Sequence, residues 1–432
     1  MSSPPKIAVL GAGPAGLTLA SVLTKSNIPF TAFDLRSRPA PSSTELPSGS
    51  LDLHVESGLL VLQTCGLFEK LEQSKNECSE EIIVSDKHGE VQYQNAGDGS
   101  RPEIGRNSLT QLLLESIPEQ NIRWRHKVSS IQQASSGKWR LNFSTDHSSQ
   151  FLNPEQLSNT TSQDDEEYDL VIGADGAWSC VRPLLTSIVP QCAGVNCITL
   201  TIPNLASLHP HLAEMVGKGT YSACGPGKAV IVQRGSLDSA RIYLMIKSPS
   251  TSANQETWLT DSGLSSLTPL ALKNQLLTSP GLFSAWGGQI GELISAGCDA
   301  EIGNDVSAKP LYMLPIGHTW THVPGLTLIG DAAHLMTPFA GEGVNAAMLD
   351  ALELSQAIAK SVSSKRASSG SDEMSASERL HEAVQKYEAN MFPRAREIMK
   401  ETFQNMEIIF ADDSPKPFVQ FMKSHGPPPE AE

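Results

Sequence analysis

Residues 6–34 read KIAVLGAGPAGLTLASVLTKSNIPFTAFD, and this stretch decides the fold. Residues 7–10 form a short apolar run that is typical of a buried parallel strand. A glycine-rich turn at 11–16 follows, and residues 17–26 then show the apolar spacing of a helix. Residues 30–33 are a second apolar run, so the start of the chain predicts a βαβ unit.

The turn carries the Gly-x-Gly-x-x-Gly pattern of a dinucleotide-binding site. Its glycines allow a tight turn and a close approach of a pyrophosphate, and the helix N-terminus offers free N–H groups to the phosphates. An acid at the end of the second strand can accept hydrogen bonds from an adenosine ribose. A glycine turn without a ligand is the alternative, but the flanking βαβ unit and the acid favour binding. The candidate residues are Gly11, Ala12, Gly13, Pro14, Ala15, Gly16, Asp34, Leu35 and Arg36.

Two later segments repeat the combination of a buried strand followed by an acid and glycine. DGAWSCVR at 175–182 follows the strand predicted at 170–173. GDAAH at 330–334 follows another predicted strand and continues as LMTPFAGEGVN at 335–345.

The three segments resemble the GxGxxG, DG and GD motifs of the group A flavoprotein monooxygenases, the single-component aromatic hydroxylases. Within that superfamily the chain most resembles the tetracycline-inactivating monooxygenases of the TetX type. The supporting stretches are GSLDLH at 49–54, PEIGRN at 102–107 and the segment 334–345. The resemblance implies an α/β fold, in which a Rossmann-like FAD-binding domain of the glutathione-reductase type is joined to a β-sheet substrate domain and a long C-terminal helix.

The resemblance also implies a domain division. It assigns residues 1–188 and 320–362 to a discontinuous FAD-binding domain, 189–319 to a β-rich substrate-binding domain, and 376–432 to a bridging helix and tail. Two local expectations accompany this division. Apolar spacing predicts a helix within 51–72, and the long helix over 378–410 is expected to break before Pro393.

The family pattern implies roles for individual residues. Asp331 stands where the family's acid hydrogen-bonds the ribityl chain of FAD, and Arg106 matches an arginine along the ribityl and phosphate region. Gly341 and Gly343 open a helix whose N-terminal end faces the flavin pyrimidine, where its dipole stabilises negative charge on the reduced flavin and its C4a-peroxide. His334 is interpreted as structural rather than catalytic. The other expected FAD contacts are Asp52, Asp175, Gly330, Pro338, Val344 and Asn345.

The implied reaction depends on the cofactor and on no catalytic protein residue. One dinucleotide fingerprint occurs, which suits FAD as the resident cofactor and NADPH or NADH as a reductant that binds transiently. The implied sequence is hydride transfer to FAD, reaction with O2 to give a flavin C4a-hydroperoxide, and hydroxylation of a phenolic or enolic polycyclic small molecule.

Expected substrate contacts lie in the loop before the helix that Gly341 and Gly343 open, and on the β-rich segment. Pro338, Phe339 and Gly341 would form the floor beside the flavin. Thr199 and Arg241 stand where the tetracycline-inactivating enzymes have a glutamine and a histidine, which puts tetracycline itself in doubt. A permanently charged Arg241 in this roof would favour an anionic ring substituent, whereas the alternative places it on the surface.

Composition sets wider limits. A formal charge of −15 over 432 residues disfavours nucleic acid or an anionic membrane as the main partner. Seven scattered cysteines show neither CxxC pairs nor zinc spacing, so free thiols and no metal site are expected. Without a signal-like N-terminus or an apolar run of membrane-spanning length, we expect a soluble, cytoplasmic monomer. Two alternatives remain, namely another FAD oxidoreductase, such as a dehydrogenase or oxidase, and a binding protein like the GDP-dissociation inhibitors.

Overall fold

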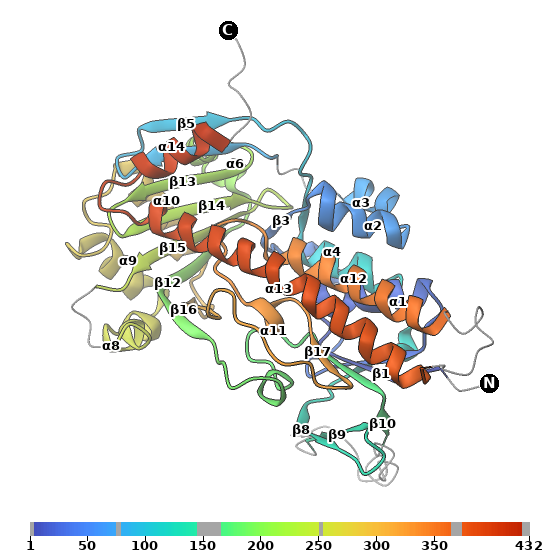
Figure 1. Cartoon of the computed structure of the whole chain (residues 1–432). Coiled ribbons are helices and arrows are strands. Elements are labelled where there is room, and N and C mark those ends of the chain that lie inside the picture. Colours follow the sequence, from blue (N-terminus) through green and yellow to red (C-terminus); the bar gives the residue numbers. More distant parts are fainter. Residues whose placement is uncertain (1–3, 75–78, 145–165, 250–253, 364–373, 426–432) are drawn as a thin grey trace, which may run out of the picture.

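The computed structural model describes residues 4–74, 79–144, 166–249, 254–363 and 374–425 (Figure 1). Its strands are β1 Ile7–Leu10, β2 Phe30–Asp34, β3 Ser50–Asp52, β4 Ile82–Asp86, β5 Val91–Asn95, β6 Glu103–Gly105, β7 Ile122–Trp124, β8 Val128–Gln133, β9 Trp139–Phe143, β10 Glu167–Tyr168, β11 Leu170–Gly173, β12 Gln191–Ile202, β13 Thr220–Gly225, β14 Lys228–Arg234, β15 Ala240–Lys247, β16 Ser307–Met313 and β17 Leu326–Leu328. Its helices are α1 Pro14–Lys25, α2 Leu60–Cys65, α3 Phe68–Ser74, α4 Arg106–Leu114, α6 Leu205–Leu208, α7 Pro210–Val216, α8 Trp258–Asp261, α9 Pro269–Thr278, α10 Gly288–Ala300, α11 Asp331–His334, α12 Gly343–Ser363, α13 Ala376–Ile409 and α14 Lys416–His425.

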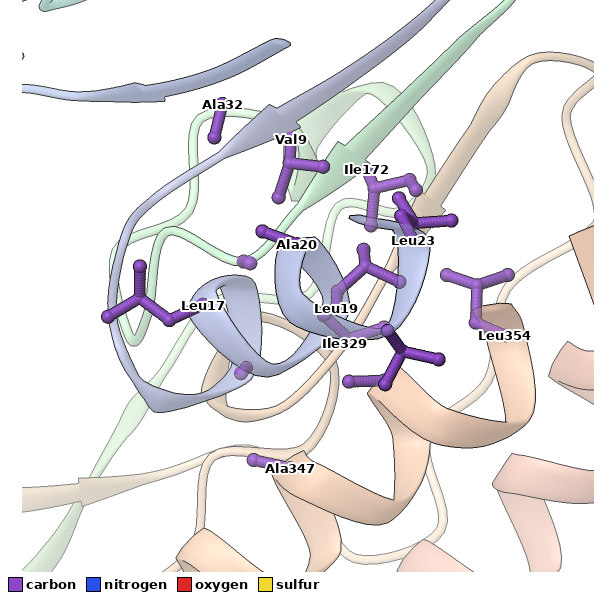
Figure 2. Packing of buried hydrophobic residues seen from close by; sticks show 14 of the residues in the cluster. Val9, Leu17, Leu19, Ala20, Leu23, Ala32, Ile172, Ile329, Ala347 and Leu354 are labelled. Atoms are coloured by element: carbon purple, nitrogen blue, oxygen red, sulfur yellow. The ribbon is translucent and has the colours of Figure 1, made fainter. Parts of the chain in front are cut away.

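A five-stranded parallel sheet forms the first layer, in the order β17-β11-β1-β2-β7. Helices α1 and α12 pack together beside it, and Figure 2 shows Leu19 and Leu23 of α1 among Ile172 of β11 and Leu354 of α12. These side chains are almost completely buried, which is why the runs read as continuously apolar. The predicted βαβ unit and the mixed α/β fold are confirmed.

A seven-stranded sheet forms a second layer, in the order β16-β12-β15-β14-β13-β4-β5. One face packs on α9 and α10 through alternate apolar residues such as Ile242, Leu244 and Ile290. The hairpin β4–β5, predicted from its sequence, joins this sheet because β4 pairs in parallel with β13. Thus a segment far upstream in the chain completes the β-rich layer.

The long helix α13 crosses the molecule beside α12 and ends near the seven-stranded sheet (Figure 1). It begins at a capping box in which the Ser375 side chain accepts from the Glu378 N–H and Glu378 accepts from the Ser375 N–H. The expected break before Pro393 is wrong, because α13 is continuous through it. Buried residues on both sides of the proline, including Met391 and Ala395, hold the helix together despite the missing N–H.

The expected helix within 51–72 is also partly wrong. Its start is β3, which pairs antiparallel with β6, and a single π-turn at Val55–Leu59 precedes α2. Gly66, with φ +74°, then ends α2. The apolar spacing was real, but pairing of Ser50–Asp52 with the 103–105 strand overrides it at the N-terminal end.

The structure bears in part on two expectations from composition, namely that the cysteines are free thiols and that no segment spans a membrane. Six cysteines are free, and Cys78 lies outside the described residues, as do the last seven residues of the predicted tail. Among the helices that the structure describes, none combines the length and apolar character needed to cross a membrane.

Candidate functional site

Three predicted turns meet at the carboxyl ends of β1, β11 and β17. The turn after β1 lies against the loop after β11, since a Cβ added to Gly11 would stand 2.3 Å from the Ala174 carbonyl oxygen. Gly11 has φ +105°, so the turn requires glycine both for its conformation and for space. Gly16 is as restricted, because its Cβ would stand 1.9 Å from the Gly11 carbonyl oxygen. The structure therefore brings the fingerprint and the DG segment into contact.

The N-terminus of α1 is suited to a phosphate group. Its N-cap residue, Gly13, is extended and provides no side-chain cap, and Pro14 occupies the first helical turn. No heavy atom lies within 4 Å of the position that a Gly13 Cβ would take. Uncapped N–H groups that face open space are what the pyrophosphate of FAD requires.

Asp331 presents an uncommitted carboxylate at the end of β17. The residue is exposed, and no hydrogen-bond partner for its side chain occurs in the part of the chain that the structure describes. Desolvation nevertheless raises the pKa of Asp331, and the charges of His334 and Arg106 act against this rise. An exposed carboxylate that is also desolvated has protein on several sides. These properties fit an acceptor for the ribityl hydroxyls of FAD.

Asp34 was expected to accept hydrogen bonds from an adenosine ribose, but its carboxylate oxygens already have partners within the protein. Its Oδ2 accepts from the Ala12 N–H and from Arg36 Nη2, both at 2.7 Å, and its Oδ1 accepts from the Arg36 N–H and Nε. Desolvation opposes ionisation, but these hydrogen bonds keep the pKa of Asp34 below its usual value. A carboxylate has about four acceptor sites, so ribose binding would require the exposed Arg36 side chain to move. Leu35 is exposed as well.

The GD segment is held from behind by buried charged side chains. Asp350 of α12 accepts from the Gly330 N–H at 2.9 Å and faces His334 Nε2 at 2.6 Å. Arg182 donates to the carbonyl oxygens of Ala332 and Ala177, which ties the DG segment to the GD segment. His334 is buried with Asp350 and points away from solvent, in agreement with a structural role.

Asp175 is committed on one side only. Its Oδ2 accepts from the Cys180 N–H at 2.7 Å, which closes the DG turn. Its Oδ1 is buried and has no partner among the described residues. This oxygen is closed off by protein atoms, so Asp175 shapes the DG turn rather than offering a free acceptor.

The glycine loop before α12 packs on β3. A Cβ on Gly341, whose φ is +71°, would stand 3.3 Å from both carboxylate oxygens of Asp52. Asn345 is fully buried, and its Oδ1 accepts from the His54 N–H while its Nδ2 donates to the Asp52 carbonyl oxygen. The Asn345 side chain thus forms its hydrogen bonds within the protein, so a cofactor contact from Asn345 would have to come from its backbone. Gly343 has open space at its Cβ position.

Sequence reasoning assigned no role to His54 or Glu342, although both belong to this loop assembly. His54 is buried between the Asp52 and Glu342 carboxylates. One signal was available, because Asp52 and His54 are two residues apart, a spacing that places side chains on one side of an extended segment.

The C-terminal end of α13 supports the expected substrate loop. Thr402 Oγ1 donates to the Thr337 carbonyl oxygen at 2.6 Å, and Asn405 Nδ2 donates to the Phe339 carbonyl oxygen at 3.1 Å. The Phe339 ring meets Phe410 edge to face, with 5.4 Å between centroids. Pro338 is exposed beside it.

The predicted roof residues share one face of the seven-stranded sheet. Thr199 of β12 is paired with Tyr243 of β15, and Arg241 lies two residues before Tyr243 on the same face of β15. These three residues alternate along their strands with residues that are buried against α9 and α10. Their face is the one on which Phe339 and the end of α13 pack. A Cβ on Gly49 would stand 3.1 Å from the Tyr243 hydroxyl and 3.9 Å from Arg241 Cδ. Arg241 is thus half-buried beside β3, and Tyr243 is a site candidate that sequence reasoning missed.

Two arginines meet at Tyr243. The Arg106 N–H donates to the Gly49 carbonyl oxygen, which brings the start of α4 to the same place. Desolvation raises the pKa of Tyr243, while the positive charges of Arg241 and Arg106 lower it. No carboxylate pairs with either guanidinium in the described ranges. The region therefore carries positive charge, which the Asp331 carboxylate offsets only from beyond ion-pair distance of Arg106.

Comparison with known proteins agrees with this geometry. Residues 320–389 match the family model described as an FAD binding domain. The chain is 38% identical to monooxygenase penA of Penicillium thymicola, with 97% of this chain and 98% of penA covered. It is 36% identical to monooxygenase asqM of Emericella nidulans, over 97% of this chain and 98% of asqM.

Solved structures show the same fold at low identity. Klebsiella pneumoniae HpxO in complex with FAD and uric acid matches with a TM-score of 0.70 at 19% identity, over 97% of this chain and 93% of HpxO. Tetracycline destructase Tet(55) matches with a TM-score of 0.68 at 18% identity, over 98% and 94%. The likeness to the tetracycline-inactivating enzymes is thus one of fold. The relatives of high coverage place the chain among the group A FAD-dependent monooxygenases, and the protein is an FAD-dependent monooxygenase.

Proposed function

We propose that this monooxygenase uses NAD(P)H and O2 to hydroxylate an anionic phenolic or enolic ring of a polycyclic small molecule. The overall reaction consumes NAD(P)H, a proton, O2 and the substrate, and yields NAD(P)+, water and the hydroxylated product. Bound FAD supplies the redox chemistry of this reaction, and the chain supplies binding, orientation and charge.

The cofactor position that we propose follows from the fit described above. The N-terminus of α1 would bind the pyrophosphate, Asp331 the ribityl chain, and the loop at Gly341 and Gly343 the flavin ring. On this basis we propose that residues 1–188 and 320–362 form the FAD-binding unit. The β-rich segment 189–319, extended by the hairpin β4–β5, would then cover the substrate.

One observation carries the substrate class. Arg241 and Arg106 lie near Tyr243 and Gly49, and neither guanidinium forms an ion pair with a carboxylate of the described chain. Arginine is always charged and presents a planar set of donors, so it recognises an enolate or phenolate oxygen well. The Phe339 ring, which belongs to the same apolar cluster as Tyr243, offers an apolar contact. The uric acid bound by HpxO, an enzyme of the same fold, is also a ring acid.

Electron-rich carbons beside an ionised oxygen are also what the reaction needs. Holding the substrate as its anion would activate the adjacent ring carbon toward an electrophilic oxygen. We propose this role for Arg241, while Thr199 leaves more room than a longer side chain would. Tetracyclines would accordingly be accepted weakly or not at all.

The test is oxidation of NADPH or NADH by the FAD-loaded enzyme with phenols, phenolic polyketides and tetracyclines, coupled to mass detection of the product. We expect a gain of one oxygen atom with an acidic phenol or enol and not with its O-methyl ether, which cannot ionise. Substrate oxidation without oxygen gain would indicate a dehydrogenase or oxidase instead. Equal turnover of the ether would overturn the anionic substrate class.

A further inference from the structure

His54 lies between two carboxylates from separate parts of the chain. Its Nε2 stands 2.9 Å from Asp52 Oδ2, and its Nδ1 stands 3.2 Å from Glu342 Oε1. Its side chain is 2% exposed, whereas those of Asp52 and Glu342 are 33% and 24% exposed. The imidazole is therefore buried between two acids whose carboxylates remain partly exposed.

The geometry indicates that His54 is protonated on both nitrogens. An ionised carboxylate can only accept hydrogen bonds, so each ring nitrogen that faces one must carry a proton. The contact with Glu342 is an ion pair, since its angle falls short of a directed hydrogen bond. Burial acts to lower the pKa of His54, but the two acids outweigh it and raise the pKa to about 9. The ring is thus an imidazolium at neutral pH.

This ion triad is built into the glycine loop. Glu342 stands between Gly341 and Gly343, and the Asp52 carboxylate lies against Gly341. Asn345 fixes the backbone on both sides, because it binds the His54 N–H and the Asp52 carbonyl oxygen. Among the described elements that pack here, Asp52 of β3 and Glu342 of the loop are the titratable groups in contact with the imidazole.

We propose that His54 is a positioning residue that neutralises one of these two acids and so sets the charge facing the flavin ring. This inference rests on the proposed placement of the flavin ring at Gly341 and Gly343. Reduction adds negative charge to that ring, and the N-terminus of α12 favours this charge. With His54 the triad carries one net negative charge. Without it two uncompensated carboxylates would stand beside the loop and oppose flavin reduction.

The decisive measurement is the midpoint potential of bound FAD, followed by its absorbance during titration with a reductant. In His54→Gln we expect reduced FAD to bind about tenfold more weakly relative to oxidised FAD than in the wild type. That change lowers the two-electron midpoint potential by about 30 mV. Removing one acid as well, in His54→Gln/Glu342→Gln, restores the net charge of the triad and is expected to restore the potential.

A matched control is available in His322, a largely covered histidine that contacts a buried carboxylate. His322 Nδ1 stands 2.8 Å from a carboxylate oxygen of Glu388 in α13, and no contact with Asp52, Glu342 or the glycine loop is recorded for it among the described residues. His322→Gln is expected to leave the potential unchanged even if it lowers the melting temperature. This control separates loss of a buried ion pair from loss of charge beside the flavin.

Each result decides the inference. An unchanged potential in His54→Gln, or a lowered potential that Glu342→Gln does not restore, overturns it. If His54→Gln alone cannot retain FAD, recovery of both FAD and potential in the double variant supports it, and no recovery contradicts it. A wild-type enzyme that binds FAD and inserts oxygen while the variant potential stays constant would leave the proposed function intact and reject only the role of His54.

Discussion

Asp350 Oδ2 lies 2.6 Å from His334 Nε2, and both side chains are almost completely buried. Arg394 of α13 reaches the other oxygen of Asp350 at 2.7 Å, and the Gly330 N–H also donates to this acid. One carboxylate thus connects α12, α13 and the turn that ends in Asp331. The position of Asp331, the acid that we propose binds FAD, therefore depends on a buried charge network behind the turn.

Replacement of Asp350 by asparagine is expected to destabilise the protein strongly. The change leaves Arg394 and His334 without their shared negative partner, and breaking a buried ion pair from one side costs about 3–5 kcal/mol of unfolding free energy. Urea unfolding measures the loss. Glu353→Gln removes the more exposed carboxylate partner of Arg394 and is expected to cost much less. Equal stability of Asp350→Asn and wild type would refute the network.

The same pair predicts the pH dependence of that loss. Desolvation acts to lower the pKa of His334, but Asp350 raises it above 6.5, so this stabilisation is complete below pH 6.5 and is lost as pH rises through the raised value. Desolvation acts to raise the pKa of Asp350, but His334 lowers it below 3.8, so its contribution is present above pH 3.8 and is lost in stronger acid. The gap between wild type and Asp350→Asn should be largest between pH 3.8 and 6.5. Unfolding at pH 5.5 and pH 9 tests this, and a wider gap at pH 9 would contradict it.

Asp331→Ala is expected to lose most of its FAD. Hydrogen bonds to a charged acceptor are worth about 1.5–3 kcal/mol, which corresponds to binding weakened roughly ten- to hundredfold. Because the Asp331 side chain has no partner in the described chain, its removal should leave the stability of the FAD-free protein nearly unchanged. Flavin fluorescence titration measures the affinity, and Asp305→Ala, at an exposed position before β16, is the control. Unaltered FAD affinity would show that Asp331 has another role.

Local patterns predicted the strands, the three turns and the free acid after β17, because each lies within a few residues of its partner in the motif. The hairpin β4–β5 was recognised, but its place in the seven-stranded sheet depends on pairing with β13, which no local pattern records. The continuity of α13 through Pro393 likewise depends on tertiary burial. The place of the hairpin in the sheet and the continuity of α13 therefore depend on tertiary contacts, which a local sequence pattern does not contain.

The candidate site shows the same division. Asp34 follows the motif, yet its acceptor sites are filled by Arg36 and Ala12, a detail of side-chain geometry. Tyr243 and Glu342 become candidates only when β15 and the glycine loop come near β3. Motifs therefore indicate the candidate site, and the contacts between distant segments decide which of its side chains remain free to bind a ligand.

Thr402→Val should disturb the substrate loop from outside it. Thr402 is fully buried, and loss of its hydroxyl leaves the Thr337 carbonyl oxygen without this donor, at a cost of about 1–3 kcal/mol. Because the same loop carries Phe339, we expect a raised substrate KM together with lower stability, whereas FAD affinity should change little. Glu401→Gln alters the exposed neighbouring residue and is the control. A variant with normal stability and normal KM would count against the bridging role of α13.

Arg241→Ala should raise the KM for the acidic substrate about tenfold or more, because one charge-assisted hydrogen bond is lost. Arg241→Lys keeps the charge and is expected to fall between wild type and alanine. Arg234→Ala is the matched control, since Arg234, the last residue of the neighbouring strand β14, pairs with Asp238 in the turn that follows. Steady-state kinetics with the acid identified by the oxygenation screen decides the matter. Kinetics unaffected by Arg241→Ala would place this side chain outside the substrate site.

Two glycines of the first turn should respond differently to the same added methyl group. Gly13 has a φ of −82°, which alanine adopts readily, and its Cβ position is open. Gly13→Ala should therefore fold with nearly normal stability when FAD is absent. If a phosphate occupies that open space, the methyl group displaces it, and FAD affinity should fall at least tenfold.

Gly11→Ala should instead damage the FAD-free protein itself. Its φ of +105° is unfavourable for alanine, and the Cβ would stand 2.3 Å from the Ala174 carbonyl oxygen, so a loss of about 1–3 kcal/mol or more is expected. Thermal unfolding of both variants without FAD, followed by FAD titration of the folded fraction, compares the two effects. Normal FAD binding by Gly13→Ala would show that the pyrophosphate does not lie over this turn, because the added methyl group has no protein atom to meet and could lower affinity only by occupying the ligand's place.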